Sequence, residues 1–193
     1  ALGGMGATVT AMLVEQESIC IAQVGDSRAY ILREQRIKQL TIDQTIGQLM
    51  VDKGLATSEE AAKSLNRHVL LQAIGGQQDL QVAMSSIKLQ DGDIFLLCSD
   101  GLSDKLVMLE MKEIVQGSDN LEKAATLLID LAKRRGGDDN ITVVLVKFEG
   151  NGLKKSLSDE SITEKVSVVR RFSAEMNSAC GLTQSLPTIH RTL

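Results

Sequence analysis

The feature that most constrains the fold is an unbroken apolar run in the middle of the chain, Ile94-Phe95-Leu96-Leu97-Cys98. A run this short, preceded by turn residues, is typical of a β-strand. Side chains of a strand alternate between its two faces, so this run places apolar groups on both of them. Both faces must therefore be covered, and the run predicts a sheet that lies between two other layers of the protein.

Other strand-like segments surround this run. The first forty residues hold short stretches rich in Val, Ile and Leu, separated by turn residues, which predict an antiparallel meander. Strand character returns on either side of the apolar run, and the last strand is expected near residue 148. The predicted strands cover residues 7–14, 18–24, 29–33, 37–40, 79–88, 94–98 and 141–148.

Helical patterns fill most of the remaining sequence up to residue 150. Residues 45–64 are helix formers and predict two short helices, the second of which begins at the capping-box pattern Thr57-Ser58-Glu59-Glu60. Residues 121–134 carry one apolar stripe and form the clearest helix, with Asn120 or Asp119 as its N-cap, and a further helix is expected over 109–116. Strands packed against these helices predict an α+β domain.

The composition changes once, near residue 150, where apolar periodicity gives way to a Ser- and Thr-rich stretch. We therefore expect one domain over residues 1–150 and a tail or linker over residues 151–193. The competing interpretation is that residues 166–172 add an edge strand to the sheet. The missing initiator Met indicates that the chain is a piece of a longer protein.

Charge and composition exclude several classes of partner. The chain has 21 basic and 25 acidic residues and only 2% aromatic residues, which argues against a nucleic-acid partner. No apolar run approaches the roughly 18 to 20 residues of a membrane span, and the first residues do not resemble a secretory leader. Three cysteines without Cys-x-x-Cys spacing argue against a zinc site and favour a reducing compartment. We expect a cytoplasmic protein without a membrane partner.

Three acidic motifs lie in turns at the ends of apolar strands. Taken alone, each is more typical of a β-turn or helix cap, in which Asp and Asn bond to their own backbone. Several carboxylates that converge at strand ends, however, are costly unless a cation pairs with them. Oxygen ligands without nearby His or Cys favour magnesium or manganese over zinc. The motifs are Gly25-Asp26-Ser27-Arg28, Ser99-Asp100-Gly101-Leu102-Ser103-Asp104 and Gly137-Asp138-Asp139-Asn140.

Taken together and in order, six blocks of this sequence resemble those of the bacterial metal-dependent Ser/Thr protein phosphatases, the PPM or protein phosphatase 2C type. The resemblance covers about residues 5 to 148, and the ordered series is far more specific than any one motif. The blocks are Met5-Gly6-Ala7-Thr8, residues 24–30, Leu40-Thr41-Ile42-Asp43-Gln44-Thr45, Leu71-Gln72-Ala73-Ile74-Gly75, residues 92–104, and Asp138-Asp139-Asn140-Ile141-Thr142.

This resemblance implies a sandwich of antiparallel sheets flanked by helices, with residues 45–67 as a flap beside a metal site. In the family, Asp100 and Asp139 correspond to metal ligands, and Asp26 and Asp104 correspond to ligands of a further ion. The implied cofactors are two or three Mn²⁺ or Mg²⁺ ions. The implied reaction is hydrolysis of phosphoserine and phosphothreonine in proteins by an activated water, opposing a Ser/Thr kinase.

The family pattern is incomplete in this chain. The N-terminal strands, a phosphate-gripping Arg and an Asp-Gly-x-Gly-Gly turn are absent from the sequence, and Gln44 and Gln72 stand where many relatives have His and Arg. We therefore expect this chain alone to be a weak or inactive enzyme. The alternatives are a catalytically inactive PPM-like regulatory or interaction module, and the relative that acts in partner-switching control of sigma factors.

Two other reactive side chains carry weaker expectations. No acidic residue is spaced along the sequence to orient His68, so we expect a surface or flap role for it. Cys98 lies in the most apolar run and is expected to be a buried, unreactive thiol.

Overall fold

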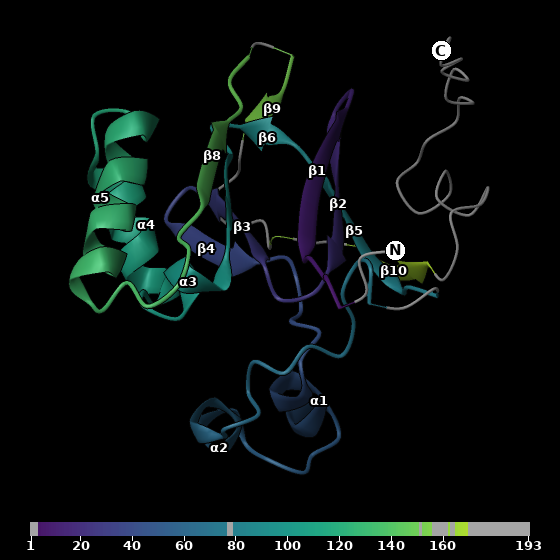
Figure 1. Cartoon of the computed structure of the whole chain (residues 1–193). Helices are drawn as coiled ribbons and strands as arrows, with labels where there is room; N and C mark the ends of the chain where they lie inside the picture. Colours follow the sequence, from purple (N-terminus) through teal and green to yellow (C-terminus); the bar gives the residue numbers. More distant parts are fainter. Residues whose placement is uncertain (1–3, 77–78, 151, 156–161, 163–164, 170–193) are drawn as a thin grey trace, which may run out of the picture.

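Two antiparallel sheets form the centre of the computed structural model, which describes residues 4–76, 79–150, 152–155, 162 and 165–169. The first sheet has the strand order β1-β2-β5-β10 (Figure 1). Its strands are β1 (Val9–Glu15), β2 (Ser18–Val24), β5 (Val82–Lys88) and β10 (Lys165–Val169). Each neighbouring pair is antiparallel. The predicted meander is wrong, because β2 pairs with β5 whereas the next strand along the chain, β3 (Arg28–Arg33), lies in the other sheet.

The second sheet has the strand order β4-β3-β7-β8 and is also antiparallel throughout. Its strands are β4 (Arg36–Gln39), β3 (Arg28–Arg33), β7 (Ile94–Cys98) and β8 (Val143–Lys147). The apolar run over residues 94–98 is thus β7, with a hydrogen-bonded neighbour on each side.

Helices cover the outer face of the second sheet (Figure 1). They are α3 (Asp100–Ser103), α4 (Met108–Gly117) and α5 (Leu121–Arg134). The longest begins where its sequence predicts, because the side chain of Asn120 accepts a hydrogen bond from the Lys123 N–H. The α+β sandwich expected from the sequence is therefore confirmed.

The two faces of β7 point into different parts of the core. Phe95 belongs to the cluster between the two sheets, together with Ile21 and Ile31. Leu96 belongs to the cluster between the second sheet and the helices, together with Leu128. Phe95 and Leu96 are both 0% exposed, so the prediction that both faces of this strand are covered is confirmed.

The flap projects from one end of the sandwich as two short helices, α1 (Ile46–Asp52) and α2 (Ser58–Lys63) (Figure 1). The capping box of α2 forms as predicted, since the Thr57 side chain accepts from the Glu60 N–H while the Glu60 carboxylate accepts from the Thr57 N–H. The two ends of the flap meet at a neck, where the Ile46 N–H donates to the Val69 carbonyl at 2.9 Å.

The expectation that the stretch after residue 150 is a linker is wrong for its described residues. Strand β10 pairs with β5, as the competing interpretation proposed, and β9 (Lys154–Lys155) pairs in parallel with β6 (Gln90–Asp91). Leu153 and Ile162 pack against the cluster between the sheets. Both segments pair with strands that are distant in the sequence. Local composition does not indicate such long-range pairing. Residues 170–172 lie outside the described residues, and the domain boundary near residue 150 stays a prediction.

Truncation after residue 150 is expected to lower the thermal midpoint by several degrees. The shortened chain loses the strand on β5 and the apolar contacts of Leu153 and Ile162, and each 1 kcal/mol corresponds to about 2–4 °C in a protein of this size. Thermal denaturation followed by circular dichroism measures the effect. A chain ending at residue 169 keeps every described element and serves as the control; equal midpoints for the two shortened chains would contradict the expectation.

Candidate metal centre

The turn between β2 and β3 positions the first acidic motif. Gly25 has φ +103°, and a Cβ there would lie 2.4 Å from the Thr8 Cγ2, so only glycine fits. The Gly25 N–H also donates to the Gln44 side chain at 2.7 Å. The turn therefore holds Asp26 in a fixed position, where the residue is only 7% exposed.

Ser99 joins the second and third acidic motifs. Its hydroxyl donates to the Asn140 carbonyl at 2.8 Å and accepts from the Thr142 N–H at 3.0 Å. A Cβ on Gly101 would lie 2.6 Å from the same Asn140 carbonyl, so the two segments approach more closely than another residue would allow. The start of α3, at Asp100, is thus held against the loop that carries Asp139.

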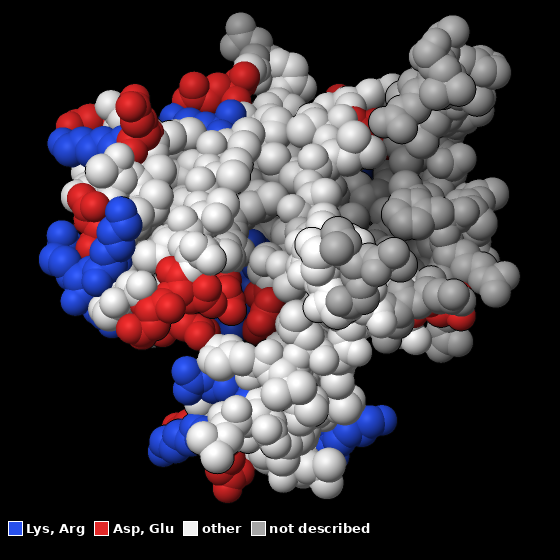
Figure 2. Space-filling view, viewed as in Figure 1, with Lys and Arg blue, Asp and Glu red and all other residues white. Residues whose placement is uncertain are grey.

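A cavity of about 310 Å³ lies where these segments meet the end of the flap. Three of the four sequence-predicted ligands line it, namely Asp100, Asp104 and Asp139. Figure 2 shows acidic side chains gathered on this part of the surface, with basic side chains of the flap beneath them. The other residues lining the cavity are Arg67, His68, Gly101, Lys105 and Asp138.

Asp26, the fourth predicted ligand, lies beside Asp100. One oxygen of each carboxylate and one ring nitrogen of His68 all lie within 4.8 Å of one another. The resemblance implies one further ion shared by Asp26 and Asp104; among the described residues, however, the group that includes Asp26 holds Asp100 and His68. Asp104 instead lies 3.1 Å from the Nε2 of His68.

His68 is the site residue that the sequence reasoning missed. No acidic residue is spaced along the sequence to contact it, but Asp104 from a distant part of the chain lies 3.1 Å from its Nε2. The expectation of a site without nearby His is wrong. His68 reaches the site because it lies at the neck of the flap, beside Val69, and no local spacing pattern records that contact. Its side chain is 43% exposed and it adjoins the flap, which agrees with the expected surface or flap role.

Burial and mutual repulsion both disfavour the charged form of the acidic residue Asp26 at the site. The pKa of Asp26 is raised from its ordinary value of 3.8 to about 6, chiefly by burial and then by the nearby carboxylates of Asp100 and Asp43. Two ligands on opposite sides of a divalent ion, each about 2.0–2.6 Å from it, lie about as far apart as the donor atoms here. The donor set therefore fits a divalent cation, which would also relieve the repulsion.

Replacing Asp26 with asparagine is expected to raise the thermal midpoint of the metal-free protein by several degrees at pH 7.5. A carboxyl whose pKa is raised by folding binds its proton more tightly in the folded state. Its stabilising contribution is present below about pH 4 and is lost as the pH rises through about 6. The gain from the substitution should therefore vanish near pH 4. Thermal denaturation in chelator at both pH values measures it.

The same substitution is expected to remove part of the midpoint increase that Mn²⁺ produces in the unsubstituted protein. Asp130→Asn is the control, since Asp130 is exposed on α5 and lies in a different element from the acidic site. Equal midpoints for Asp26→Asn and the unsubstituted protein at pH 7.5 would contradict the assigned repulsion.

An ion pair fixes the segment between β4 and the flap. Arg28 donates to Asp43 through both Nε and Nη2, at 2.9 Å and 2.6 Å. The pair encloses one side of a further cavity that reaches His68 and Asp104. Arg28 of the Gly-Asp-Ser-Arg motif therefore positions the base of the flap relative to the acidic site.

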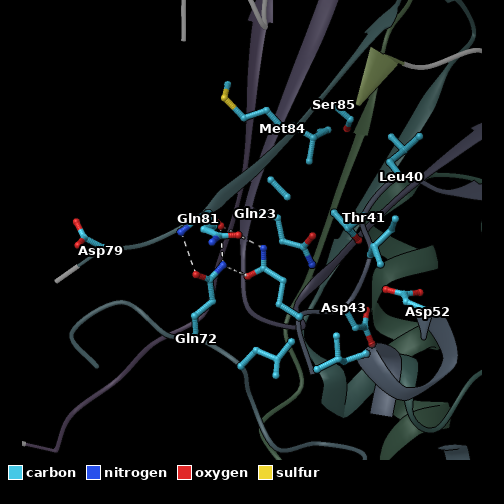
Figure 3. Close-up of a pocket in the computed structure, with 16 residues that line it drawn as sticks. Gln23, Leu40, Thr41, Asp43, Asp52, Gln72, Asp79, Gln81, Met84 and Ser85 are labelled. Carbon is cyan, nitrogen blue, oxygen red and sulfur yellow. Dashed lines mark hydrogen bonds between the residues drawn. The ribbon is translucent and has the colours of Figure 1, made fainter. Parts of the chain in front are cut away.

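A larger cavity, of about 510 Å³, lies between the first sheet and the segment that leads into the flap. Glutamine and aspartate side chains make up most of its polar wall, and Figure 3 shows Gln72 and Gln81 joined by hydrogen bonds. Gln72 also donates to Gln44 at 2.7 Å. The two glutamines that depart from the family pattern thus bind each other. Asp43, Asp52 and Asp79 also line this cavity, but the group of potential metal ligands among the described residues is Asp26, His68 and Asp100. The acidic cavity is therefore the better candidate site.

Comparisons with known proteins agree with this geometry. Residues 2–139 match the family model described as protein phosphatase 2C. The chain is 37% identical over 146 residues to the serine/threonine phosphatase stp of Listeria monocytogenes, covering 76% of this chain and 58% of that protein.

Solved structures show the same likeness. The crystal structure of the serine/threonine phosphatase PstP/Ppp of Mycobacterium tuberculosis superposes with a TM-score of 0.73 and 38% identity, covering 77% of this chain and 63% of that one. The catalytic domain of PstP in complex with two manganese ions superposes with a TM-score of 0.67 and 38% identity, covering 75% of this chain and 59% of that one. The chain thus spans about 60% of the length of these relatives.

No helix in the described ranges combines the length and apolar character that crossing a bilayer requires.

Proposed function

Because this chain belongs to the protein phosphatase 2C family, we propose that it contributes most of the active site for metal-dependent hydrolysis of phosphoserine and phosphothreonine in proteins. The observation that carries the proposal is the cavity at which α3 and the loop before β8 meet, with Asp100 and Asp139 both on its wall. Relatives named as Ser/Thr phosphatases support the reaction class.

Four carboxylates are proposed as metal ligands. Asp100 and Asp139 would hold ions at the centre of the cavity, and Asp26 and Asp104 would serve a further ion on the flap side. Mn²⁺ or Mg²⁺ fits these oxygen donors, and a PstP structure with two manganese ions supports a divalent metal. When bound, such ions would lower the pKa of a water molecule and offset negative charge on the phosphoryl group.

The chain's own residues perform the positioning. Ser99 and Gly101 hold the two ligand-bearing segments together, which fixes the spacing of the carboxylates before a substrate arrives. Arg67 and Lys105 line the same cavity and supply positive charge near an incoming phosphate. The flap covers one side of the cavity through Arg67 and His68.

We propose proteins phosphorylated on Ser or Thr as substrates, and a Ser/Thr kinase as the opposing enzyme. The reaction is placed in the cytoplasm, where ATP-dependent kinases produce such substrates. The alternative function, an inactive regulatory module of the same fold, would keep the cavity and bind a partner without turnover. Metal-dependent phosphate release discriminates between the two functions.

The test compares two proteins. The first is the chain alone, which we expect to be near background because the sequence lacks the Asp-Gly-x-Gly-Gly turn. The second, called the joined protein, places the N-terminal segment of a relative, including that turn, before residue 1. Phosphate release from a phosphothreonine peptide with added Mn²⁺ is expected from the joined protein and not in chelator. A folded joined protein that binds Mn²⁺ without turnover would support the inactive module instead.

A further inference from the structure

His68 brings a nitrogen donor from the flap to the acidic site. A ring nitrogen of His68 lies within 4.8 Å of carboxylate oxygens of both Asp26 and Asp100. Its Nε2 accepts a hydrogen bond from the Arg67 guanidinium at 2.6 Å. An imidazole that accepts at Nε2 presents the lone pair that metal ions bind. The three donors come from three separate segments, so the arrangement is a feature of the fold.

Asp26 supplies an independent observation at the same point. Its residue is 7% exposed; its carboxylate has a backbone hydrogen bond, and the negative charges of Asp100 and Asp43 oppose its own. A buried carboxylate beside other carboxylates is costly unless a cation pairs with it. Asp100 and His68 supply the other two potential ligand atoms of the group, so the buried Asp26 carboxylate lies where the three potential ligands come together.

We propose that His68 is a direct ligand of a divalent transition-metal ion, together with Asp26 and Asp100, and that this nitrogen donor makes the site prefer Mn²⁺ to Mg²⁺. Imidazole suits transition metals, whereas Mg²⁺ is held by oxygen donors. The proposal goes beyond the four carboxylates of the proposed function. It concerns metal binding alone and does not depend on whether the protein hydrolyses phosphoesters.

The proposal has a consequence for the flap. An ion bound at Nε2 would take the place of the Arg67 N–H, since one lone pair serves one partner at a time. Ion binding would then tie the neck of the flap to Asp26 and Asp100. Amide hydrogen exchange in residues 45–67 should therefore slow when Mn²⁺ binds.

The test uses the untagged 193-residue chain and one Mn²⁺ per protein. Pulsed electron paramagnetic resonance detects a coordinated imidazole by the modulation that its ¹⁴N nucleus produces. The sequence holds two histidines, so His68→Asn is paired with His190→Gln as the matched control. We expect the ¹⁴N modulation in the unsubstituted chain and in His190→Gln, and its loss in His68→Asn.

Affinity gives the second measurement. Loss of a residue that hydrogen-bonds to a metal ligand typically lowers metal affinity about 10–100-fold. Loss of the ligand itself should therefore weaken Mn²⁺ binding at least about tenfold. The effect on Mg²⁺ binding should be smaller. Circular dichroism and the metal-free thermal midpoint confirm that His68→Asn folds, and His68→Gln serves as a second variant.

Three results would overturn the proposal: no Mn²⁺ binding, no ¹⁴N modulation in the unsubstituted chain, or modulation that persists in His68→Asn. Labelling histidine with ¹⁵N should convert the ¹⁴N signal into a ¹⁵N signal, which separates imidazole from backbone nitrogen. Failure of the joined protein to release phosphate would count against the proposed function and would leave these spectra unaffected, so the two failures are distinguishable.

Discussion

Replacing Asp93 with alanine is expected to lower the free energy of unfolding by about 3–5 kcal/mol. Asp93 forms a bidentate ion pair with Arg33, with both N–O distances at 2.7 Å. The two side chains are only 1% and 7% exposed. Removing the carboxylate leaves a buried guanidinium without its counter-charge, and the fold cannot easily hydrate it.

The pair also organises the backbone around it. Asp93 accepts from the Gln90 N–H at 2.8 Å, and Arg33 donates to the Lys88 carbonyl at 2.8 Å. Lys88 ends β5 in the first sheet, whereas Arg33 ends β3 in the second. The loss of Asp93 therefore weakens the link between the two sheets as well as the ion pair.

Urea unfolding followed by circular dichroism measures the loss. Asp119→Ala is the matched control, because the Asp119–Lys123 pair is exposed, and exposed pairs contribute only about 0–1 kcal/mol. The double variant Arg33→Met, Asp93→Leu should lose less than Asp93→Ala, because it leaves no unpaired charge. A loss for Asp93→Ala no larger than that of the surface control would show that the core pair is not a main support of the fold.

Local sequence patterns were sufficient to predict the position of those helices and strands whose apolar periodicity and capping residues indicate the same element. Strand β7 has an apolar residue at each position, and α5 has one apolar stripe behind an Asn cap; both form where predicted. The same holds for the capping box of Thr57 and Glu60. Such signals depend on neighbours within about four residues, which the sequence displays directly.

The parts that could not be predicted depend on contacts between distant segments. Residues 165–169 become a strand because β5 offers an unpaired edge, and their composition alone favoured a linker. His68 meets Asp104 only because the neck of the flap closes at Ile46 and Val69. For Gly101, only the structure identifies the Asn140 carbonyl as the group that a Cβ would meet.

Adjacent aspartates in the loop before β8 provide the sharpest test of the catalytic assignment. Both Asp138 and Asp139 line the acidic cavity. Asp138 lies 2.5 Å from the Lys105 Nζ, and its side chain is 76% exposed. Among the hydrogen bonds of the described residues, Asp139 takes part in one, in which its Oδ1 accepts from the Asn140 N–H at 2.6 Å. Its second carboxylate oxygen is therefore available to a cation.

In the joined protein, Asp139→Asn and Asp100→Asn are each expected to reduce Mn²⁺-dependent phosphate release by roughly 100-fold or more, the effect typical of removing one preorganised electrostatic group. An amide keeps the shape of the side chain but supplies no negative charge to the ion. Asp138→Asn is the matched control. It removes an exposed ion pair with Lys105 and should change turnover by less than about threefold, since such pairs contribute about 0–1 kcal/mol.

Phosphate release at saturating peptide, measured across a Mn²⁺ titration, separates weaker metal binding from slower turnover. If the assignment is correct, the required Mn²⁺ concentration rises for Asp139→Asn and Asp100→Asn and stays unchanged for Asp138→Asn. The reverse ranking of the two neighbours would assign the ligand role to Asp138. Equal, small effects from all three variants would place the reactive ions elsewhere, because a carboxylate that binds a catalytic ion cannot lose its charge without affecting that ion.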